Sequence, residues 1–165
     1  MVGCACIPPE PPAGTTWREL MGAALEEAFA ASRENEAPIG AALYSPAGGL
    51  LAKAHNRPIG ACDPTAHAEI LCLRTAAEEV GNYRLTGSIM VVTLEPCIMC
   101  VGALIHARVA GVVFGAPDPR AGALVSNLDG HALPFTNHRM WYVAGVMQDE
   151  CSATLKRFFL GKRKG

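Results

Sequence analysis

The spacing of hydrophobic positions changes several times along the chain and predicts alternating helices and strands. Apolar residues follow Thr16 at helical spacing, and Thr16 and Glu19 have the separation of a capping box. We therefore expect a first helix that runs to about Asn35. The short apolar stretches 39–44 and 50–55 flank a turn rich in proline and glycine, which is typical of a β-hairpin.

The later part of the pattern predicts a parallel crossover unit. An apolar, β-branched strand is expected at 88–93, followed by a helix that Pro96 opens and that ends near His106, and then by a strand at 109–114. A strand, a helix and a strand in this order indicate a parallel pair and an α/β fold. Residues 115–138 show no clear periodicity, and a loop of this length is often functional. The other expected elements are a helix over 63–81, a strand over 140–146 and a helix over 150–160.

The composition indicates a folded domain. Of the 165 residues, 50% are hydrophobic and 18% are charged, which excludes intrinsic disorder for most of the length. Hydrophobic runs fall short of the roughly 20 residues that a membrane span needs, and the start lacks the features of a secretory signal. We expect a cytoplasmic protein with no membrane association, made of a flexible proline-rich arm over 1–14 and a single domain over 15–165.

The net charge and the number of cysteines limit which kinds of partner and site the protein can have. A formal net charge of -1 excludes a basic field over the whole molecule. The last ten positions are nevertheless strongly basic, and phosphate contacts are expected there if the partner is a nucleic acid. Seven cysteines are an odd number, and in such a chain they are more often buried, metal-binding or catalytic than bridged. The basic residues at the end are Lys156, Arg157, Lys162, Arg163 and Lys164.

Two short motifs at expected helix starts contain metal-binding side chains. Cys97 and Cys100 are three residues apart, so on a helix they face the same direction and can bind one ion. With His67 they form a set of one imidazole and two sulfurs, which suits zinc and leaves the fourth tetrahedral position for water. An open position is typical of a catalytic site. The positive end of each helix dipole also favours thiolate.

Glu69 is the candidate acid and base of this site. It comes two residues after His67, near enough to approach a water at the metal without binding the metal itself. It can take a proton from water and return protons to a ring nitrogen and to a leaving amine, which are the transfers that hydrolytic deamination requires. The pattern H-x-E followed by P-C-x-x-C is the signature of zinc-dependent nucleobase deaminases.

Other interpretations of these motifs are a structural zinc site or a redox C-x-x-C pair. A structural site needs a fourth ligand, and the remaining cysteines do not form a second pair with the spacing of a metal finger. We interpret them as core or surface thiols, and the other histidines as ordinary core or surface residues. The residues concerned are Cys4, Cys6, Cys62, Cys72, Cys151, His55, His106, His131 and His138.

Longer stretches make the sequence resemble the bacterial tRNA-specific adenosine deaminases from about residue 15 to the end. This resemblance implies a cytidine-deaminase-like fold, a three-layer α/β/α sandwich with a central mixed five-stranded sheet. It also implies one Zn²⁺ per subunit, no organic cofactor, a homodimer, and conversion of adenosine to inosine at the wobble position of a tRNA anticodon. The stretches are 56–60 (NRPIG), 63–70 (DPTAHAEI), 82–85 (NYRL), 93–100 (TLEPCIMC), 113–116 (VFGA) and 137–139 (NHR).

The resemblance assigns roles to individual residues: His67, Cys97 and Cys100 match the zinc ligands, Glu69 the proton shuttle, Asn56 an asparagine that contacts the flipped base, and Asp118 an acidic residue of the substrate loop. For Asn56 the chemistry agrees, because an amide offers both a donor and an acceptor to a purine edge. An asparagine at this place also fits an ordinary turn.

The substrate loop departs from the family pattern at two positions. Pro117 fixes the backbone just before Asp118, and Val125 stands where relatives tend to carry glycine. We therefore expect a loop of different shape. The Cys-Pro arm at the N-terminus has no family counterpart.

Two other function classes share these motifs. A zinc-dependent deaminase of a free base or nucleoside, such as guanine or cytosine, has the same signature, but a small neutral substrate does not need the basic C-terminal end. Basic ends are also often only solvated surface. A zinc-binding module without catalysis is favoured only where the glutamate is lost, and Glu69 is present.

Overall fold

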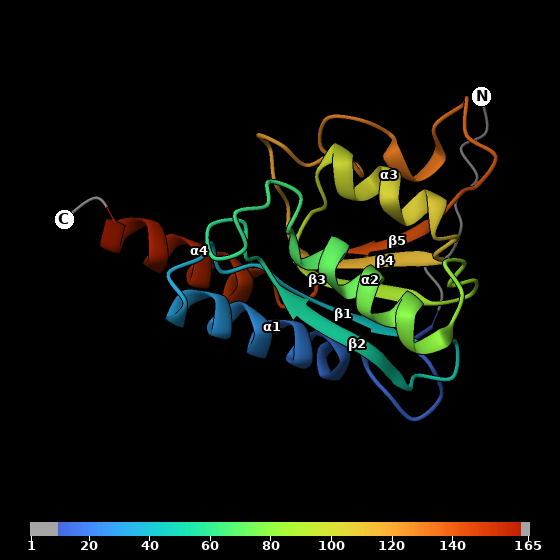
Figure 1. Cartoon of the computed structure of the whole chain (residues 1–165), viewed down its shortest axis with the longest axis horizontal. Helices are drawn as coiled ribbons and strands as arrows, with labels where there is room; N and C mark the ends of the chain where they lie inside the picture. The colour runs from blue at the N-terminus through green and yellow to red at the C-terminus, as the bar shows by residue number, and fades with distance from the viewer. Residues whose placement is uncertain (1–9, 163–165) are drawn as a thin grey trace.

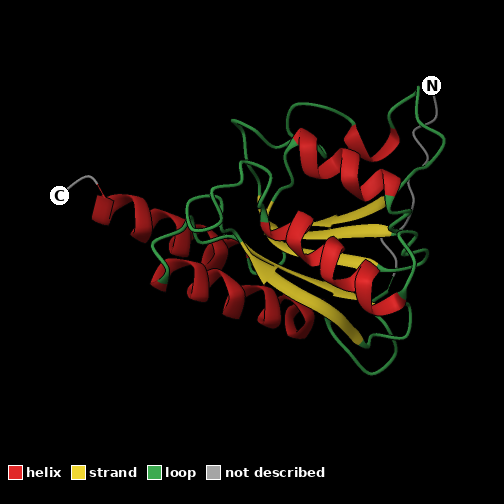
Figure 2. Cartoon of the chain, in the orientation of Figure 1, coloured by secondary structure: helices red, strands yellow, loops and turns green. Residues whose placement is uncertain are grey.

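The computed structural model describes residues 10–162 and shows the expected three-layer α/β/α fold (Figure 1). In chain order the elements are α1 (Trp17–Arg33), β1 (Gly40–Tyr44), β2 (Leu50–His55), α2 (Ala68–Val80), β3 (Ile89–Leu94), α3 (Ile98–His106), β4 (Gly111–Ala116), a short 3-10 turn (Gly130–Ala132), β5 (Trp141–Ala144) and α4 (Gln148–Lys162). The sheet has the strand order β2-β1-β3-β4-β5. Helices α2 and α3 cover one face of it, and α1 and α4 cover the other (Figure 2).

The strand directions bring several chain segments to one edge of the sheet. Strand β1 pairs antiparallel with β2 and β3, whereas β3 with β4 and β4 with β5 are parallel. The predicted hairpin and the predicted parallel crossover are therefore both confirmed. Because only β1 runs in the opposite direction, the carboxyl ends of the other strands lie at the same edge. Residues Asn56, Glu95 and Pro117, which follow β2, β3 and β4, start the loops at that edge.

Helix α1 begins and ends for the reasons that its sequence indicates. The Thr16 hydroxyl accepts a hydrogen bond from the backbone N–H of Glu19, and the Glu19 carboxylate accepts one from the backbone N–H of Thr16, at 3.2 and 2.8 Å. This capping box satisfies N–H groups that lack partners inside the helix. Asn35 has a φ of 64°, in the left-handed region, so the helix stops at Arg33, two residues before the expected end.

The last strand is shorter than expected. Gly145 and Met147 have φ values of 81° and 53°, which interrupt the extended backbone after Ala144. The chain turns there, and α4 starts at Gln148 rather than at Glu150. Helix α4 then extends beyond the sheet, beside the C-terminal end of α1 (Figure 1).

The core consists of two hydrophobic clusters, one on each face of the sheet. All five residues of β1 are buried, as expected for a strand with helices on both sides. Gly40 allows α1 to pack directly on this strand, because a Cβ at Gly40 would lie 2.0 Å from the carbonyl oxygen of Ala24. Any larger residue would force α1 and the sheet apart.

The structure describes part of the expected N-terminal arm and three of the five other cysteines. Residues 1–9 of the expected arm, including Cys4 and Cys6, lie outside the described residues. In the rest of the arm Pro12 is buried, and its carbonyl accepts a hydrogen bond from the backbone N–H of Thr15. Cys72 and Cys151 are buried and Cys62 is exposed. Among residues 10–162, none of the helices combines the length and apolar character that crossing a membrane requires.

Candidate metal centre and active site

The three predicted ligands meet in one small triangle. Nδ1 of His67 lies 3.6 Å from the Sγ atoms of both Cys97 and Cys100, and the two sulfurs are 3.7 Å apart. Tetrahedral zinc with bonds of about 2.3 Å to sulfur and about 2.0 Å to nitrogen places its ligand atoms about 3.5 to 3.8 Å apart. The triangle therefore fits a zinc ion. Within the part of the chain that the structure describes, no fourth His, Cys, Asp or Glu belongs to this group, as in catalytic zinc sites.

Local backbone structure presents these ligands at the carboxyl edge of the sheet. His67 is the N-cap of α2 and Cys97 is the N-cap of α3, and both have extended backbone angles. Helix α3 therefore begins after Cys97, and not at Pro96 as the sequence indicates. Hydrogen bonding to Cys100, and to a lesser extent to His67, lowers the pKa of Cys97 to about 3. The hydrogen bond to the Cys97 thiol raises the pKa of Cys100.

Glu69 lies in the first turn of α2 and is 3% exposed. Burial raises the pKa of its carboxyl group, because the charged form loses water. The group also interacts with the Cys100 thiol, so it lies beside the triangle although it does not belong to it. A carboxyl group with a raised pKa next to a metal site is suited to both accepting and returning a proton.

Asn56 is buried at the end of β2, where its side chain caps helix α2. Its Oδ1 accepts a hydrogen bond of 2.8 Å from the backbone N–H of Ala68, which replaces the cap that the His67 side chain does not provide. Among the described residues, Nδ2 has no hydrogen bond. Of the two ends of this amide, Oδ1 already accepts the bond from Ala68 with one of its two lone pairs, and Nδ2 is the end that can donate to a substrate.

Asp118 closes a turn in the loop after β4. Its Oδ1 accepts hydrogen bonds from the backbone N–H groups of Arg120 and Ala121, at 3.0 and 3.2 Å. Both hydrogen bonds stay within the loop, so this oxygen stabilises the turn of the loop. Val125 is not among the described residues with positive φ, so valine at the position where relatives tend to carry glycine causes no backbone strain.

Glu95 is a buried residue of the site that no sequence motif indicated. This residue is 2% exposed, and its carboxylate accepts hydrogen bonds from the backbone N–H groups of Asp118, Val125 and Ser126, at 3.0, 2.9 and 2.8 Å. The Ser126 hydroxyl donates a further one. The available signal was a charged residue between a buried strand and a Pro-Cys motif, where solvent exposure is not expected.

A second buried carboxylate, that of Glu36, was also missed. It is 2% exposed and accepts hydrogen bonds from the backbone N–H groups of Gly60 and Ile59, at 2.7 and 3.4 Å. These two residues belong to the loop that connects Asn56 to His67. Buried carboxylates thus bind the loops on both sides of the candidate site.

Comparison with known proteins places this site in a family. The model of the "cytidine and deoxycytidylate deaminase zinc-binding region" matches residues 15–116. A tRNA-specific adenosine deaminase of Haemophilus influenzae is 42% identical over 146 residues, which are 88% of this chain and 84% of that protein. The matched region includes Asn56, the three ligands and Glu69, and it ends before Asp118.

Two solved structures show the same fold. One comes from studies of A-to-I editing by tRNA:A34 deaminases at the wobble position of transfer RNA. It is 39% identical with a TM-score of 0.80 and covers 83% of this chain and 99% of its own. The other is a guanine deaminase from Nitrosomonas europaea, 25% identical with a TM-score of 0.71, covering 92% of this chain and 87% of its own.

Proposed function

Because the chain belongs to the cytidine and deoxycytidylate deaminase zinc-binding family, we propose that it is a zinc-dependent hydrolase that converts adenosine to inosine at the wobble position of a tRNA anticodon. The observation that carries this proposal is the zinc-sized triangle of His67, Cys97 and Cys100 with the buried Glu69 beside it. A tRNA substrate also supports a cytoplasmic location.

Each residue has one task in this reaction. Zinc, when bound by the triangle, supplies the Lewis-acid chemistry that activates water for attack on C6 of adenine. Glu69 takes one proton from the attacking water and passes it to the ring nitrogen, and then takes the second proton from the same oxygen and passes it to the amine, which leaves as ammonia. The Nδ2 group of Asn56 donates a hydrogen bond to an acceptor on the base. The buried position of Glu69 keeps bulk water away from these transfers.

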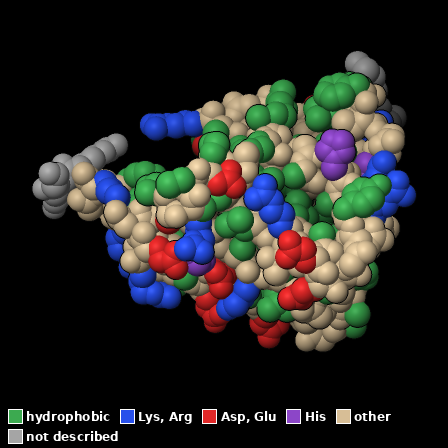
Figure 3. Space-filling view, viewed as in Figure 1, with side chains coloured by type: hydrophobic (Ala, Val, Ile, Leu, Met, Phe, Trp, Pro, Cys, Tyr) green, Lys and Arg blue, Asp and Glu red, His purple; other side chains and the backbone are tan. Residues whose placement is uncertain are grey.

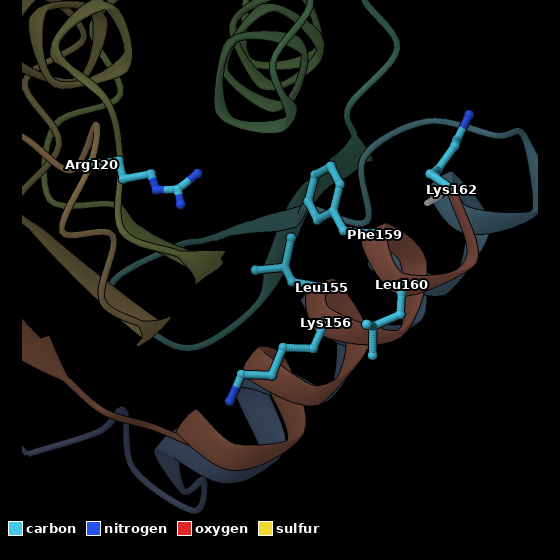
Figure 4. A pocket seen from close by; sticks show the side chains of 6 residues that line it. All are labelled: Arg120, Leu155, Lys156, Phe159, Leu160 and Lys162. Atoms are coloured by element: carbon cyan, nitrogen blue, oxygen red, sulfur yellow. The ribbon is translucent and has the colours of Figure 1, made fainter. Parts of the chain in front are cut away.

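The surface beside the carboxyl edge of the sheet supports an RNA substrate. A hollow of about 570 Å³ lies between Arg120, in the loop after β4, and the exposed side of α4 (Figure 4). Phe159 is 50% exposed in this hollow, and Lys156 and Lys162 flank it. Cations can contact phosphates and an exposed aromatic ring can stack on a base. The remaining basic residues of this end, Arg163 and Lys164, lie outside the described residues.

We expect the double variant Lys156→Ala/Lys162→Ala to bind an anticodon stem-loop more weakly and with a flatter salt dependence. Each phosphate contact that is lost reduces the slope of log K against log salt by roughly 0.7 for single-stranded RNA. Titration of a labelled stem-loop at several salt concentrations measures both effects. Arg18→Ala is the control, because Arg18 is bound to Glu150 away from the hollow and its loss leaves the slope unchanged. An unchanged slope in the double variant would exclude α4 from the RNA interface.

An inosine assay tests the proposed substrate directly. The zinc-loaded protein is incubated with a transcribed anticodon stem-loop that has adenosine at the wobble position, and in parallel with free adenosine, cytidine and guanine. We expect product from the stem-loop alone, since a base is extruded from a single-stranded loop at little cost. Deamination of a free base with no reaction of the stem-loop would instead identify a small-molecule deaminase.

The outer face of α3 supports a homodimer. Ile98 is 56% exposed there, and Gly102 and Ala103 are only partly buried, so small and apolar groups face outward beside α2. Hydrophobic side chains are also visible on the surface over α2 and α3 (Figure 3). A symmetric contact with a second copy would cover this face, in agreement with the dimer that the family resemblance implies.

We expect Gly102→Glu to convert the dimer to a monomer. A Cβ at Gly102 has no atom within 4 Å in the isolated chain, so the new side chain fits the monomer and obstructs only a partner. Gly22→Glu, on α1, is the matched control because a Cβ there is equally free. Sedimentation at micromolar concentration distinguishes the two variants. A wild-type protein that sediments as a monomer would contradict the proposed dimer.

A further inference from the structure

We propose that Glu95 is a positioning residue, which anchors the substrate loop (residues 117–126) to the segment that carries Cys97 and thereby determines how well the enzyme binds RNA. The RNA part of this inference rests on the proposed function. The anchoring part rests only on the contacts that Glu95 makes in the structure.

A single buried carboxylate binds both ends of the substrate loop. Asp118 donates to it from the beginning of the loop, and Val125 and Ser126 donate from the end. Three backbone N–H groups and one hydroxyl thus converge on two oxygen atoms. Hydrogen bonds to an ionised acceptor in a buried place are stronger than neutral ones, and breaking them leaves donors without partners.

Backbone contacts connect the same loop to the metal-binding segment. The N–H of Glu95 donates to the carbonyl of Ala116, and the N–H of Ala123 donates to the carbonyl of Pro96, both at 2.9 Å. Cys97 and Gly122 form an isolated antiparallel bridge. The loop is therefore placed directly against Pro96 and against Cys97, the first cysteine ligand.

Gly122 shows how closely the loop packs on Glu95. A Cβ at Gly122 would lie 2.4 Å from the Glu95 Oε2 atom and 2.6 Å from the carbonyl oxygen of Asp118. No side chain fits there unless the carboxylate or the loop moves. The structure thus offers a way to disturb the same contact from the loop side, without changing Glu95.

The contacts of Glu95 separate its role from catalysis. Glu95 is not in the group of potential metal ligands, and the loop donors occupy its oxygens. Arg120 lies within the loop that it anchors and faces α4 across the hollow (Figure 4). Release of the loop would therefore displace Arg120, a cation of the proposed RNA-binding surface, whereas Glu69 and the triangle are held by other elements.

The test compares Glu95→Gln and Gly122→Ala with the wild-type enzyme. For both variants we expect the KM for an anticodon stem-loop to rise on the order of tenfold, the effect of losing a hydrogen bond to a charged group. We expect kcat to stay within about threefold and zinc to remain at about one per chain. Amide hydrogen exchange over 117–126 should become faster, while exchange in β3 and α3 should not. Ser126→Ala removes only the hydroxyl donor, so its effects should be smaller.

Two outcomes would overturn the proposal. Unchanged exchange over 117–126 in both Glu95→Gln and Gly122→Ala would show that Glu95 does not hold the loop. A fall in kcat or in zinc content with an unchanged KM would place Glu95 at the metal centre instead. If the wild-type enzyme fails to react with the stem-loop, the proposed function fails and so does the RNA part of this inference, whereas the exchange measurement still decides the anchoring.

Discussion

The Glu69→Ala protein is expected to bind about one zinc per chain and to deaminate the stem-loop about 10² to 10⁴-fold more slowly than the wild type, the usual contribution of a positioned acid and base. Zinc remains because His67, Cys97 and Cys100 are its ligands and Glu69 is not one of them. Activity falls because Glu69 is the carboxyl group that interacts with the Cys100 thiol beside the triangle, so without it protons must be exchanged with solvent. The fold should persist, since alanine suits the first turn of α2.

Single-turnover rates with excess enzyme, together with metal analysis of the same samples, measure this effect without interference from product release. Glu79→Ala is the matched control, because Glu79 is on the same helix and is exposed. It should retain full activity. Activity of a zinc-replete Glu69→Ala protein close to that of the wild type would end the assignment of Glu69 as the proton shuttle.

The features that the sequence predicted correctly depend on neighbours in the chain. The capping box of α1 is formed by residues three positions apart, and the hairpin by strands that a short turn connects. The metal motif follows the same rule, because Cys97 and Cys100 are one helical turn apart. His67 was placed by the family signature, and the triangle with the two sulfurs confirms that it meets them.

The features that were missed depend on distant partners. The carboxylate of Glu95 binds backbone groups 23 to 31 positions later in the chain, and Glu36 binds groups 23 to 24 positions later. Neither partner set has a sequence pattern, because any residue except proline offers a backbone N–H. The same limitation applies to Asn56, whose Oδ1 already accepts a hydrogen bond from the N–H of Ala68, 12 positions away. A motif shows which side chains are present, but not which of their atoms are free.

Asn56→Asp should separate the two roles of Asn56. The aspartate oxygen can still accept the hydrogen bond from the Ala68 N–H, and a negative charge at the start of α2 is favourable. Thermal stability and zinc content should therefore stay close to those of the wild type. The donor toward the base is lost, so we expect turnover of the bound stem-loop to fall about 10²-fold, as when one donor at a reacting group is removed. Overall RNA binding should change less, because phosphate contacts dominate it.

Asn56→Ala provides the comparison, since it removes the cap together with the donor. Its turnover should fall as far as that of Asn56→Asp, and its free energy of unfolding should fall by a further ~1 kcal/mol, the usual value of a helix cap. Thermal unfolding of the zinc-loaded proteins and single-turnover rates measure the two effects separately. Full activity of Asn56→Asp beside an unstable Asn56→Ala would show that Asn56 only caps α2. The base must then be recognised by other groups, because the Nδ2 donor at the end of β2 would have no part in the reaction.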